Sequence, residues 1–364
     1  MTETPMTDNS MTNHSTPTHP DIKTRIARFV DDPTSADFAT LALAAFAFQY
    51  EHIEPYRNLC DARGIDPTRL DDWRAVPAVP TGAFATTPLH AAEPREIFRS
   101  SGTTGPKGGA RSVHHHPFPD LYRHVIDASF PHYCLPTPTP LPMLALIPSR
   151  DQLGDSSLGF MTDHVLRNWG APESRYAFGP HGVETDIATN WCAEQTRPVL
   201  ILTTAFALVD WLDSLDTPLQ LPAGSVIFET GGTKGRTREV SRSELIDMIT
   251  TGLSVPHDHV VREYGMTELT SQLYGDPLHG GDPDVLVAPH WVRVRILDPI
   301  SLEEVATGEE GLISFVDLGN LGSAIHVLTE DIGYASGSGI VLVGRASGAQ
   351  LRGCSLTVEE LSRG

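Results

Sequence analysis

The chain has 364 residues and carries 46 acidic against 26 basic side chains, which gives a formal net charge of −20 at pH 7. This length allows about two domains, or one large α/β domain with a smaller satellite. The charge disfavours a nonspecific grip on nucleic acid or on an anionic membrane surface, so we expect neither partner. No apolar run approaches the roughly 20 residues that span a bilayer, and the four cysteines are scattered without a CxxC pair. We therefore expect a cytoplasmic protein with reduced thiols.

The N-terminal region divides into a polar tail and a helical part. Residues 1–20 are rich in Thr and Pro, and their only apolar side chains are methionines, so we predict a disordered tail. The segments 22–30 and 35–50 then carry apolar residues at helical spacing, the second with Ser35 as its expected N-cap. We predict a helical region over 21–90.

The rest of the chain changes its periodicity once. Between 91 and 287, short apolar runs are each followed by a helical pattern; the clearest runs are 141–148, 174–179, 198–204 and 225–232. Such alternation is typical of βαβ units around a largely parallel sheet. From Trp291 onward, only strand patterns and Gly-rich turns follow. The sequence predicts an α/β fold with a core over 91–287, and a C-terminal region over 288–364 that contains a small β-rich subdomain.

A loop dense in glycine and hydroxyl groups, RSSGTTGPKGG at 99–109, follows the strand pattern 96–98. Glycines let backbone N–H groups surround an anion, hydroxyls add donors, and a lysine adds mobile positive charge, so a polyphosphate is the natural ligand. The spacing is not that of a Walker A loop. The alternative is an ordinary flexible surface loop.

Two further strings carry polar groups that suit a nucleotide. In REYGMTE at 262–268, Thr267 can donate to a phosphate and Glu268 can hold Mg²⁺, although the pair also suits a plain helix N-terminus. In TEDIG at 329–333 and the GR string at 344–345, an Asp can accept two ribose hydroxyls and an Arg can bridge ribose and phosphate. Each string alone is also compatible with turn chemistry.

The order of these strings resembles the adenylate-forming superfamily of acyl, aryl and luciferin ligases. The strings follow one another in the order that is typical of the superfamily, over residues 98–354: SSGTTGPKG, GG at 231–232, YGMTE, TED and GR. The strings VPTGAF, GGTKG, YGMTEL, LTEDIG and GRASGAQLRGCSLTVEEL resemble the LuxE-like acyl-protein synthetases, a branch related to phenylacetate-CoA ligases. Five strings in order are far more specific than any one of them.

This resemblance implies the large N-terminal domain of an adenylate-forming ligase, with ATP and Mg²⁺ as cofactors. The implied reaction activates a carboxylic acid, as a family expectation a fatty acid, to an acyl-adenylate and passes the acyl group to a protein thiol. The residues it assigns are Ser100, Ser101, Gly102, Thr103, Thr104, Gly105 and Lys107 around the β,γ-phosphates, Gly231, Gly232 and Thr233 beside adenine and the acyl pocket, Tyr264 with Gly265 at adenine, Thr267 at the α-phosphate, Glu268 at Mg²⁺, Asp331 at ribose and Arg345 at a hinge.

In the LuxE-like branch, a cysteine near the C-terminus takes the acyl group as a thioester. Cys354 stands in RGCSL and is our candidate nucleophile, and the nearby Arg352 favours its thiolate. The alternative for Cys354 is a small buried hydrophobe. We expect the other three cysteines to lie in the core.

The sequence departs from the superfamily at two points. The phosphate loop lacks a residue that many ligases have between glycine and proline, and the chain stops at Gly364, so we expect the mobile C-terminal domain to be absent or vestigial. Lys234 then replaces the catalytic lysine of that domain, with Lys107 or Arg345 as alternatives. We expect the acceptor to be an internal cysteine or a partner, such as an acyl-CoA-reductase-type enzyme or a carrier protein. An acid–CoA ligase, a carrier-protein loader and a non-catalytic scaffold remain alternatives.

Three adjacent histidines, 114–116, follow the phosphate loop. Neighbouring side chains point in different directions on a strand or a helix, so these three cannot converge on one metal ion. We expect them to be packed or solvated.

Overall fold

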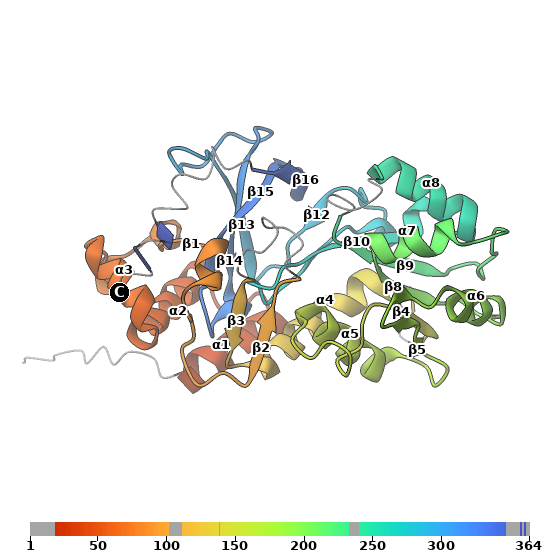
Figure 1. Ribbon diagram of the computed structural model, residues 1–364. Helices are drawn as coiled ribbons and strands as arrows, with labels where there is room; N and C mark the ends of the chain where they lie inside the picture. Colours follow the sequence, from red (N-terminus) through yellow and green to blue (C-terminus); the bar gives the residue numbers. More distant parts are fainter. Residues whose placement is uncertain are drawn as a thin grey trace, which may run out of the picture.

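The computed structural model describes residues 19–101, 111–137, 139–232, 240–346, 357–358 and 360–361 (Figure 1). An eleven-strand path forms the main sheet, in the order β13-β14-β15-β16-β12-β11-β10-β9-β8-β4-β5, and β1 is a further strand that pairs with β15. The α/β fold class predicted from the sequence is confirmed. The predicted tail lies outside the described residues up to residue 18, and its last two residues, His19 and Pro20, begin a helix instead.

Three helices form the N-terminal layer: α1 (His19–Asp31), α2 (Phe38–His52) and α3 (Glu54–Ala62). The N-cap of α2 is Asp37, whose carboxylate accepts from the Thr40 amide at 2.9 Å, and not the expected Ser35. Either residue type suits an N-cap, so the correction is one of position. After the short 3₁₀ turns η1 (Pro67–Arg69) and η2 (Trp73–Ala75), strand β1 (Val79–Pro80) runs parallel to β15, and η3 (Thr81–Ala85) follows.

The parallel half of the sheet contains the predicted strand–helix pairs. Three pairs are β4 (Met143–Leu146) with α5 (Ser157–Trp169), β8 (Leu200–Thr204) with α7 (Ala205–Asp213) and β9 (Val226–Thr230) with α8 (Arg242–Leu253). In the fourth, helix α6 (Thr185–Ala193) follows β5 (Arg175–Tyr176) and the hairpin of β6 (Phe178–Gly179) and β7 (Gly182–Val183). Strands β5, β4, β8, β9 and β10 (Val260–Tyr264) are mutually parallel, and η4 (His257–His259) leads into β10. Parallel strands need helical crossovers, which the sequence pattern supplies.

The antiparallel half begins where β10 pairs with β11 (Leu273–Tyr274). It continues through η5 (Pro277–His279), β12 (Leu286–Val287), β13 (Val292–Leu297), β14 (Gly311–Asp317), η6 (Leu318–Asn320), β15 (His326–Ser336) and β16 (Gly339–Arg345). A separate hairpin, β2 (Glu96–Arg99) with β3 (Val113–His116), precedes helix α4 (Pro119–Cys134). The strands expected after Trp291 are therefore present, and they extend the same sheet as the parallel half.

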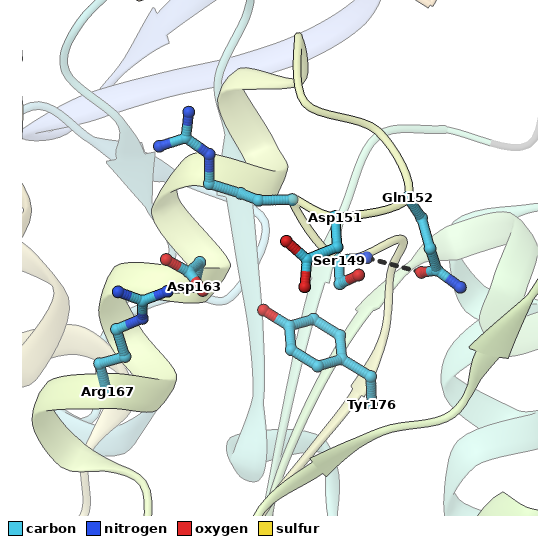
Figure 2. Close-up of a pocket in the computed structure, with 7 residues that line it drawn as sticks. Ser149, Asp151, Gln152, Asp163, Arg167 and Tyr176 are labelled. Atoms are coloured by element: carbon cyan, nitrogen blue, oxygen red, sulfur yellow. Dashed lines mark hydrogen bonds and ion pairs between the residues drawn. The ribbon is translucent and has the colours of Figure 1, made fainter.

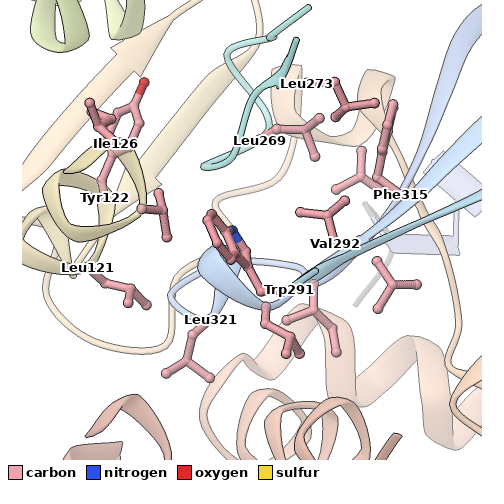
Figure 3. Close-up of a cluster of buried hydrophobic side chains, with 14 of the residues drawn as sticks. Leu121, Tyr122, Ile126, Leu269, Leu273, Trp291, Val292, Phe315 and Leu321 are labelled. Atoms are coloured by element: carbon pink, nitrogen blue, oxygen red, sulfur yellow. The ribbon is translucent and has the colours of Figure 1, made fainter. Parts of the chain in front are cut away.

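The main core joins the N-terminal helices to both halves of the sheet. Figure 3 shows Trp291 among side chains that include Leu121, Leu269 and Leu321, which come from separate parts of the chain. The same cluster extends from Ile22 to Leu361. Burial of each large apolar side chain contributes about 1.5–3 kcal/mol, so this cluster holds the elements that carry the candidate site. No helix among the described residues has the length and apolar character needed to cross a membrane.

Candidate functional site

Three polar side chains from distant segments meet where β10 ends beside the β15–β16 hairpin. The Tyr264 hydroxyl donates to Asp331 Oδ2 at 2.8 Å, and Arg345 Nε donates to Asp331 Oδ1 at 3.0 Å. The register of the hairpin sets this contact, because Asp331 lies directly opposite Arg345. Asp331 therefore has both carboxylate oxygens engaged, one by a neutral donor and one by a cation.

Gly333 lets the two strands approach at this point. The register shifts between Ile332 and Gly333, and a Cβ at Gly333 would collide with the Val341 carbonyl oxygen. A bulge of this kind re-aims side chains in its strand. The glycine of the TEDIG string thus shapes the segment that carries Asp331.

Tyr264 is buried and its position is fixed at both ends. Its ring stacks on Phe315, with 5.5 Å between ring centroids and 28° between the ring planes. Burial, together with Asp331, raises the pKa of the Tyr264 phenol well above its ordinary value, so the hydroxyl remains a donor. The assignment of this ring to adenine stays a prediction.

Glu268 connects this cluster to the phosphate-loop hairpin. Its side chain is 6% exposed, and the Ser112 side chain lies close enough to lower the pKa of its carboxyl. Burial raises its pKa, while Ser112 and the positive charge of Arg345 act in the opposite direction. Glu268 is therefore a buried carboxylate whose charge is only partly compensated by its protein neighbours.

Two histidines of β3 hold the turn that carries Thr267 and Glu268. His114 Nδ1 lies 2.7 Å from the Thr267 carbonyl oxygen, and a carbonyl can only accept, so Nδ1 carries the proton. His116 Nε2 lies 3.0 Å from the Thr270 hydroxyl, which itself donates to Asn320 Oδ1, so His116 is the donor here. Burial lowers the pKa of His114 to about 4 and that of His116 well below its ordinary value, and both rings are neutral at pH 7.

Asp317 and Asn320 hold the same turn from the opposite side. Asp317 Oδ2 accepts from the backbone amides of Thr270 and Ser271 at 3.1 and 2.8 Å. Asn320 Nδ2 donates to the Glu268 carbonyl at 2.9 Å. The sequence pattern is also compatible with a helix N-terminus here, but the turn after β10 is not helical. The side chains of Asp317 and Asn320 replace the hydrogen bonds that a helix would supply.

The stems of the phosphate-loop string are paired. The Ser100 amide donates to the Ser112 carbonyl, and the Ser112 amide donates to Ser100 Oγ, both at 3.0 Å. Arg111 donates to the Ser100 carbonyl through Nε, and its guanidinium lies 3.6 Å from Asp155. Ser101 is described and exposed, whereas Gly102, Thr103, Thr104, Gly105 and Lys107 lie outside the described residues.

The end of β9 brings the GG string to the neighbouring strand. Gly231 has a φ of +78°, a conformation that favours glycine, and Gly231 and Gly232 are exposed. Thr233 and Lys234 lie outside the described residues. Next to this end, the Thr230 hydroxyl donates to the carboxylate of Glu263, and a Cβ at Gly265 would collide with that carboxylate.

Cys354 also lies outside the described residues. The three cysteines in the part of the chain that the structure describes, Cys60, Cys134 and Cys192, are buried. Burial raises the pKa of the Cys60 and Cys192 thiols to about 12 and that of Cys134 well above its ordinary value. Thiols with such values have little thiolate at neutral pH and are poor nucleophiles.

A separate hollow of about 260 Å³ lies between the loop after β4 and helix α5. Figure 2 shows the Tyr176 ring pointing towards the helix that carries Asp163 and Arg167. The residues that line this hollow are Ser149, Arg150, Asp151, Gln152, Asp163, Arg167 and Tyr176. Charged side chains of both signs dominate this set, so the hollow is unsuited to an acyl chain.

The structure thus brings together Ser100, Tyr264, Gly265, Thr267, Glu268, Asp331 and Arg345 of the predicted site. Sequence reasoning missed the residues that hold them, which are His114, His116, Ser112, Asp317 and Asn320. The HHH string directly after the phosphate loop was the one local signal. Its alternate members share a strand face, and the strand period of two could have shown this.

Comparisons with known proteins agree with the sequence resemblance. Residues 192–362 match the family model described as acyl-protein synthetase, LuxE. A long-chain-fatty-acid–luciferin-component ligase of Vibrio harveyi is 23% identical over 143 residues, which are 37% of this chain and 36% of the relative. A protein of the same name from Photorhabdus luminescens is 40% identical over 72 residues, which are 18% of this chain and 60% of the relative. The chain thus aligns with about a third of the Vibrio protein's length, and its predicted resemblance to the LuxE branch is confirmed.

Solved structures show the fold. The 2-hydroxyisobutyryl-CoA ligase in an open conformation, bound to 2-HIB-AMP and CoA, superposes with a TM-score of 0.63 at 13% identity, over 84% of this chain and 69% of that chain. The same ligase in its thioesterification state gives a TM-score of 0.61 at 14% identity, over 89% of this chain and 67% of that chain. This chain therefore has the fold of an adenylate-forming ligase.

Proposed function

We propose that this LuxE-like chain activates a carboxylic acid with ATP to an acyl-adenylate and then transfers the acyl group to a protein cysteine. The observation that carries the proposal is the convergence of three segments: the phosphate-loop stems at Ser100 and Ser112, the Thr267–Glu268 turn, and the Asp331–Arg345 pair. These segments are far apart in sequence, and each presents groups that suit a different part of a nucleotide. A scaffold without chemistry has no need to bury such a set.

The nucleotide roles follow from donor and acceptor chemistry. Asp331 accepts hydrogen bonds on both carboxylate oxygens, from Tyr264 and Arg345. Two ribose hydroxyls could bind the same oxygens, either in place of these donors or beside them. The hydroxyl-rich loop after Ser100 supplies donors for the phosphates. Arg345 adds positive charge beside both Asp331 and Glu268.

Glu268 fits a Mg²⁺ ion. A buried carboxylate with a raised pKa is undercompensated, and a hard divalent cation would favour its charged form. When bound with ATP, Mg²⁺ offsets the negative charge that develops on the leaving pyrophosphate. The part of Glu268 is to hold the positive charge of the ion close to Thr267, whose carbonyl accepts a hydrogen bond from His114.

The first chemical step forms one bond and breaks one bond. A carboxylate oxygen of the acid attacks the α-phosphorus of ATP, the bond to the β-phosphate oxygen breaks, and pyrophosphate leaves. The protein's contribution is positioning and electrostatic stabilisation, because both reactants carry negative charge. Lys234, or alternatively Lys107 or Arg345, supplies the additional cation in this proposal.

The second step passes the acyl group to a thiolate, with release of AMP. Cys354 is the proposed acceptor, since the three described cysteines are buried with raised pKa values. The name of the Vibrio and Photorhabdus relatives supports a long-chain fatty acid as substrate. A partner protein with a reductase or carrier role then receives the thioester.

The test measures pyrophosphate release from ATP and Mg²⁺ across fatty, aromatic and amino acids. We expect release with long-chain fatty acids only, and a loss of at least about 100-fold for Glu268→Gln, in the range seen when one electrostatic group is removed. Asp163→Asn is the matched control, because its carboxylate lines the separate hollow. Silence of the parent protein with every acid, or equal rates for the Glu268→Gln variant, would overturn the proposed function.

The acceptor has its own measurement. The intact mass of the protein, after reaction with ATP and the preferred acid, should rise by one acyl group, and Cys354→Ser should abolish the rise without slowing pyrophosphate release. If the mass is unchanged and added CoA is acylated instead, the protein is an acid–CoA ligase.

A further inference from the structure

A cluster of two histidines and one aspartate lies outside the proposed adenylation site. His132 is in the last turn of α4, Asp276 is the N-cap of the 3₁₀ turn η5, and His279 is the last residue of that turn. One potential ligand atom from each residue lies within 4.8 Å of the others. Within the described part of the chain, no second cluster of this kind was found.

The three side chains are already in contact with one another. His279 Nδ1 lies 2.6 Å from Asp276 Oδ1, and the His132 and His279 rings are stacked, with centroids 4.5 Å apart and 4° between their planes. His132 and His279 are exposed and Asp276 is partly buried. The imidazoles are therefore open to solvent, and the carboxylate of Asp276 already contacts one of them.

Two contacts position the backbone that carries these residues. Tyr133, next to His132, stacks on Tyr274, with ring centroids 5.0 Å apart and 13° between the planes. The Gly275 amide, one residue before Asp276, donates to the Arg262 carbonyl at 2.8 Å. Helix α4 and the β11–η5 segment are thus in contact directly beside the cluster, so rotation of the side chains can bring the three ligand atoms onto one ion.

We propose that His132, Asp276 and His279 form a binding site for a divalent transition-metal ion of the Zn²⁺ type. Two imidazole nitrogens and one carboxylate oxygen form a donor set that suits Zn²⁺ and leaves a fourth, solvent-facing position. Ligand atoms around tetrahedral Zn²⁺ lie about 3.3 Å apart, given bonds of about 2.0–2.1 Å. Rotation of the two exposed imidazoles supplies the convergence that is needed.

The bound ion would fasten helix α4 to the segment that follows β11. Strand β11 itself pairs with β10, the strand that ends at Tyr264, so the bound ion would stiffen the support of the proposed nucleotide site. None of the three ligand residues belongs to the proposed nucleotide site, so binding of Zn²⁺ does not depend on adenylation. It is therefore tested without nucleotide.

The experiment titrates the chelator-treated, full-length protein with Zn²⁺ and, separately, with Co²⁺ at pH 7.5. We expect one site of micromolar affinity or tighter, a rise in melting temperature with Zn²⁺, and the visible absorption of tetrahedral Co²⁺. His132→Ala and His279→Ala should each weaken Zn²⁺ binding at this site at least about tenfold, the lower end for loss of a metal-site partner. Asp276→Asn should do the same.

His181→Ala is the matched control, because His181 is an exposed histidine in a distant turn. The control should bind Zn²⁺ as the parent does, and the three histidine variants should melt at the parent's temperature when metal is absent, since the exchanged histidines are exposed. Absence of micromolar binding to the parent overturns the proposal. Equal Zn²⁺ affinity and equal Co²⁺ absorption in the parent and in His132→Ala also overturn it.

Discussion

At the scale of single residues, His114 and His115 are neighbours on β3 that differ in burial and in hydrogen bonding. His114 is buried and donates to the Thr267 carbonyl, whereas His115 lies on the other face and is only partly buried. We predict that His114→Ala lowers the free energy of unfolding by about 1–3 kcal/mol or more, because a buried carbonyl loses its donor. His115→Ala should cost less than about 1 kcal/mol. Urea unfolding of the two variants measures both values.

The same pair should differ in catalysis. Because His114 positions the Thr267–Glu268 turn, its loss should reduce kcat for pyrophosphate release more than it raises KM for ATP, and His115→Ala should leave both near the parent values. His114→Asn retains a side-chain N–H donor and should recover part of the rate. Equal losses of stability and rate in the two alanine variants would show that the hydrogen bond to Thr267 is unimportant.

The raised pKa of Glu263 predicts that the free energy of unfolding depends on pH. Burial raises its pKa from the ordinary 4.5 to about 7, against the opposing hydrogen bond from Thr230. Between about pH 4.5 and 7 the folded protein keeps a proton that the unfolded chain releases, so this residue's contribution to stability falls as the pH rises. The slope is at most about 1.4 kcal/mol per pH unit.

Glu263→Gln should remove this contribution. Buried histidines such as His114 lose stability in the opposite direction, as the pH falls from 6.5 towards 4, so the difference between parent and variant is the informative quantity. That difference, from urea unfolding at several pH values, should shift steadily in favour of the variant between pH 4.5 and 7. The exposed Glu51→Gln serves as control and should follow the parent. A pH-independent difference for Glu263→Gln contradicts the prediction.

At the scale of elements, one buried polar side chain of helix α2 bonds the segment between β14 and β15. Gln49 is fully buried, donates to the Asn320 and Leu321 carbonyls at 3.1 and 3.0 Å, and accepts from the Ile325 amide at 3.0 Å. Gln49→Met keeps the volume but leaves these backbone groups without partners. We predict a loss of about 3 kcal/mol or more in the free energy of unfolding, from about 1–3 kcal/mol per unsatisfied group.

Tyr50→Phe on the same helix is the control. It removes one exposed hydrogen bond, to Asp61, and should cost no more than about 1 kcal/mol. Differential scanning calorimetry of both variants compares the two costs. If Gln49→Met melts with the Tyr50→Phe variant, water or rearranged backbone satisfies the groups around η6, and the helix is held by apolar packing alone.

The elements could be predicted from the sequence where their signal is local. Apolar periodicity over a few residues identified the strand–helix pairs and the strands after Trp291, because that periodicity is a property of each segment. The cap of α2 was misplaced, since Ser35 and Asp37 are both capping residues and only the backbone angles choose between them. Local signals thus determine which elements exist better than where they begin.

Contacts between elements carried little local signal. The pairing of β1 with β15 joins Val79 to Val327, and nothing near Val79 announces it. The site shows the same limit: Tyr264 and Asp331 were recognised as separate motifs, but the support of the turn by His114 and Asn320 depends on chain segments 153 and 52 residues away. Such contacts are decided by packing of the whole fold, which periodicity does not record.

At the scale of the whole molecule, one sheet and one main core join the N-terminal helices to the C-terminal strands. Strand β1 lies in the sheet beside β15, and His326 Nδ1 lies 2.6 Å from the Val76 carbonyl. The core cluster that contains Leu41 of α2 also contains Val327 of β15. A second cluster, around Trp211, lies on the other side of the parallel strands and includes residues of α7 and α8. The helical region and the β-rich region therefore share their burial.

Shared burial predicts shared unfolding. Amides of α2 and β15 should exchange hydrogen through the same global opening, since neither element keeps its buried surface when the other leaves. Native-state hydrogen exchange with mass spectrometry, at increasing urea below the transition, should give peptides of both elements one opening free energy and one urea dependence. Peptides of α8 are the internal comparison, because their side chains pack in the second cluster. If α2 exchanged through an opening several kcal/mol cheaper than that of β15, with a smaller urea dependence, the N-terminal helices would be a separate folding unit docked on the sheet, and the shared core would not act as one.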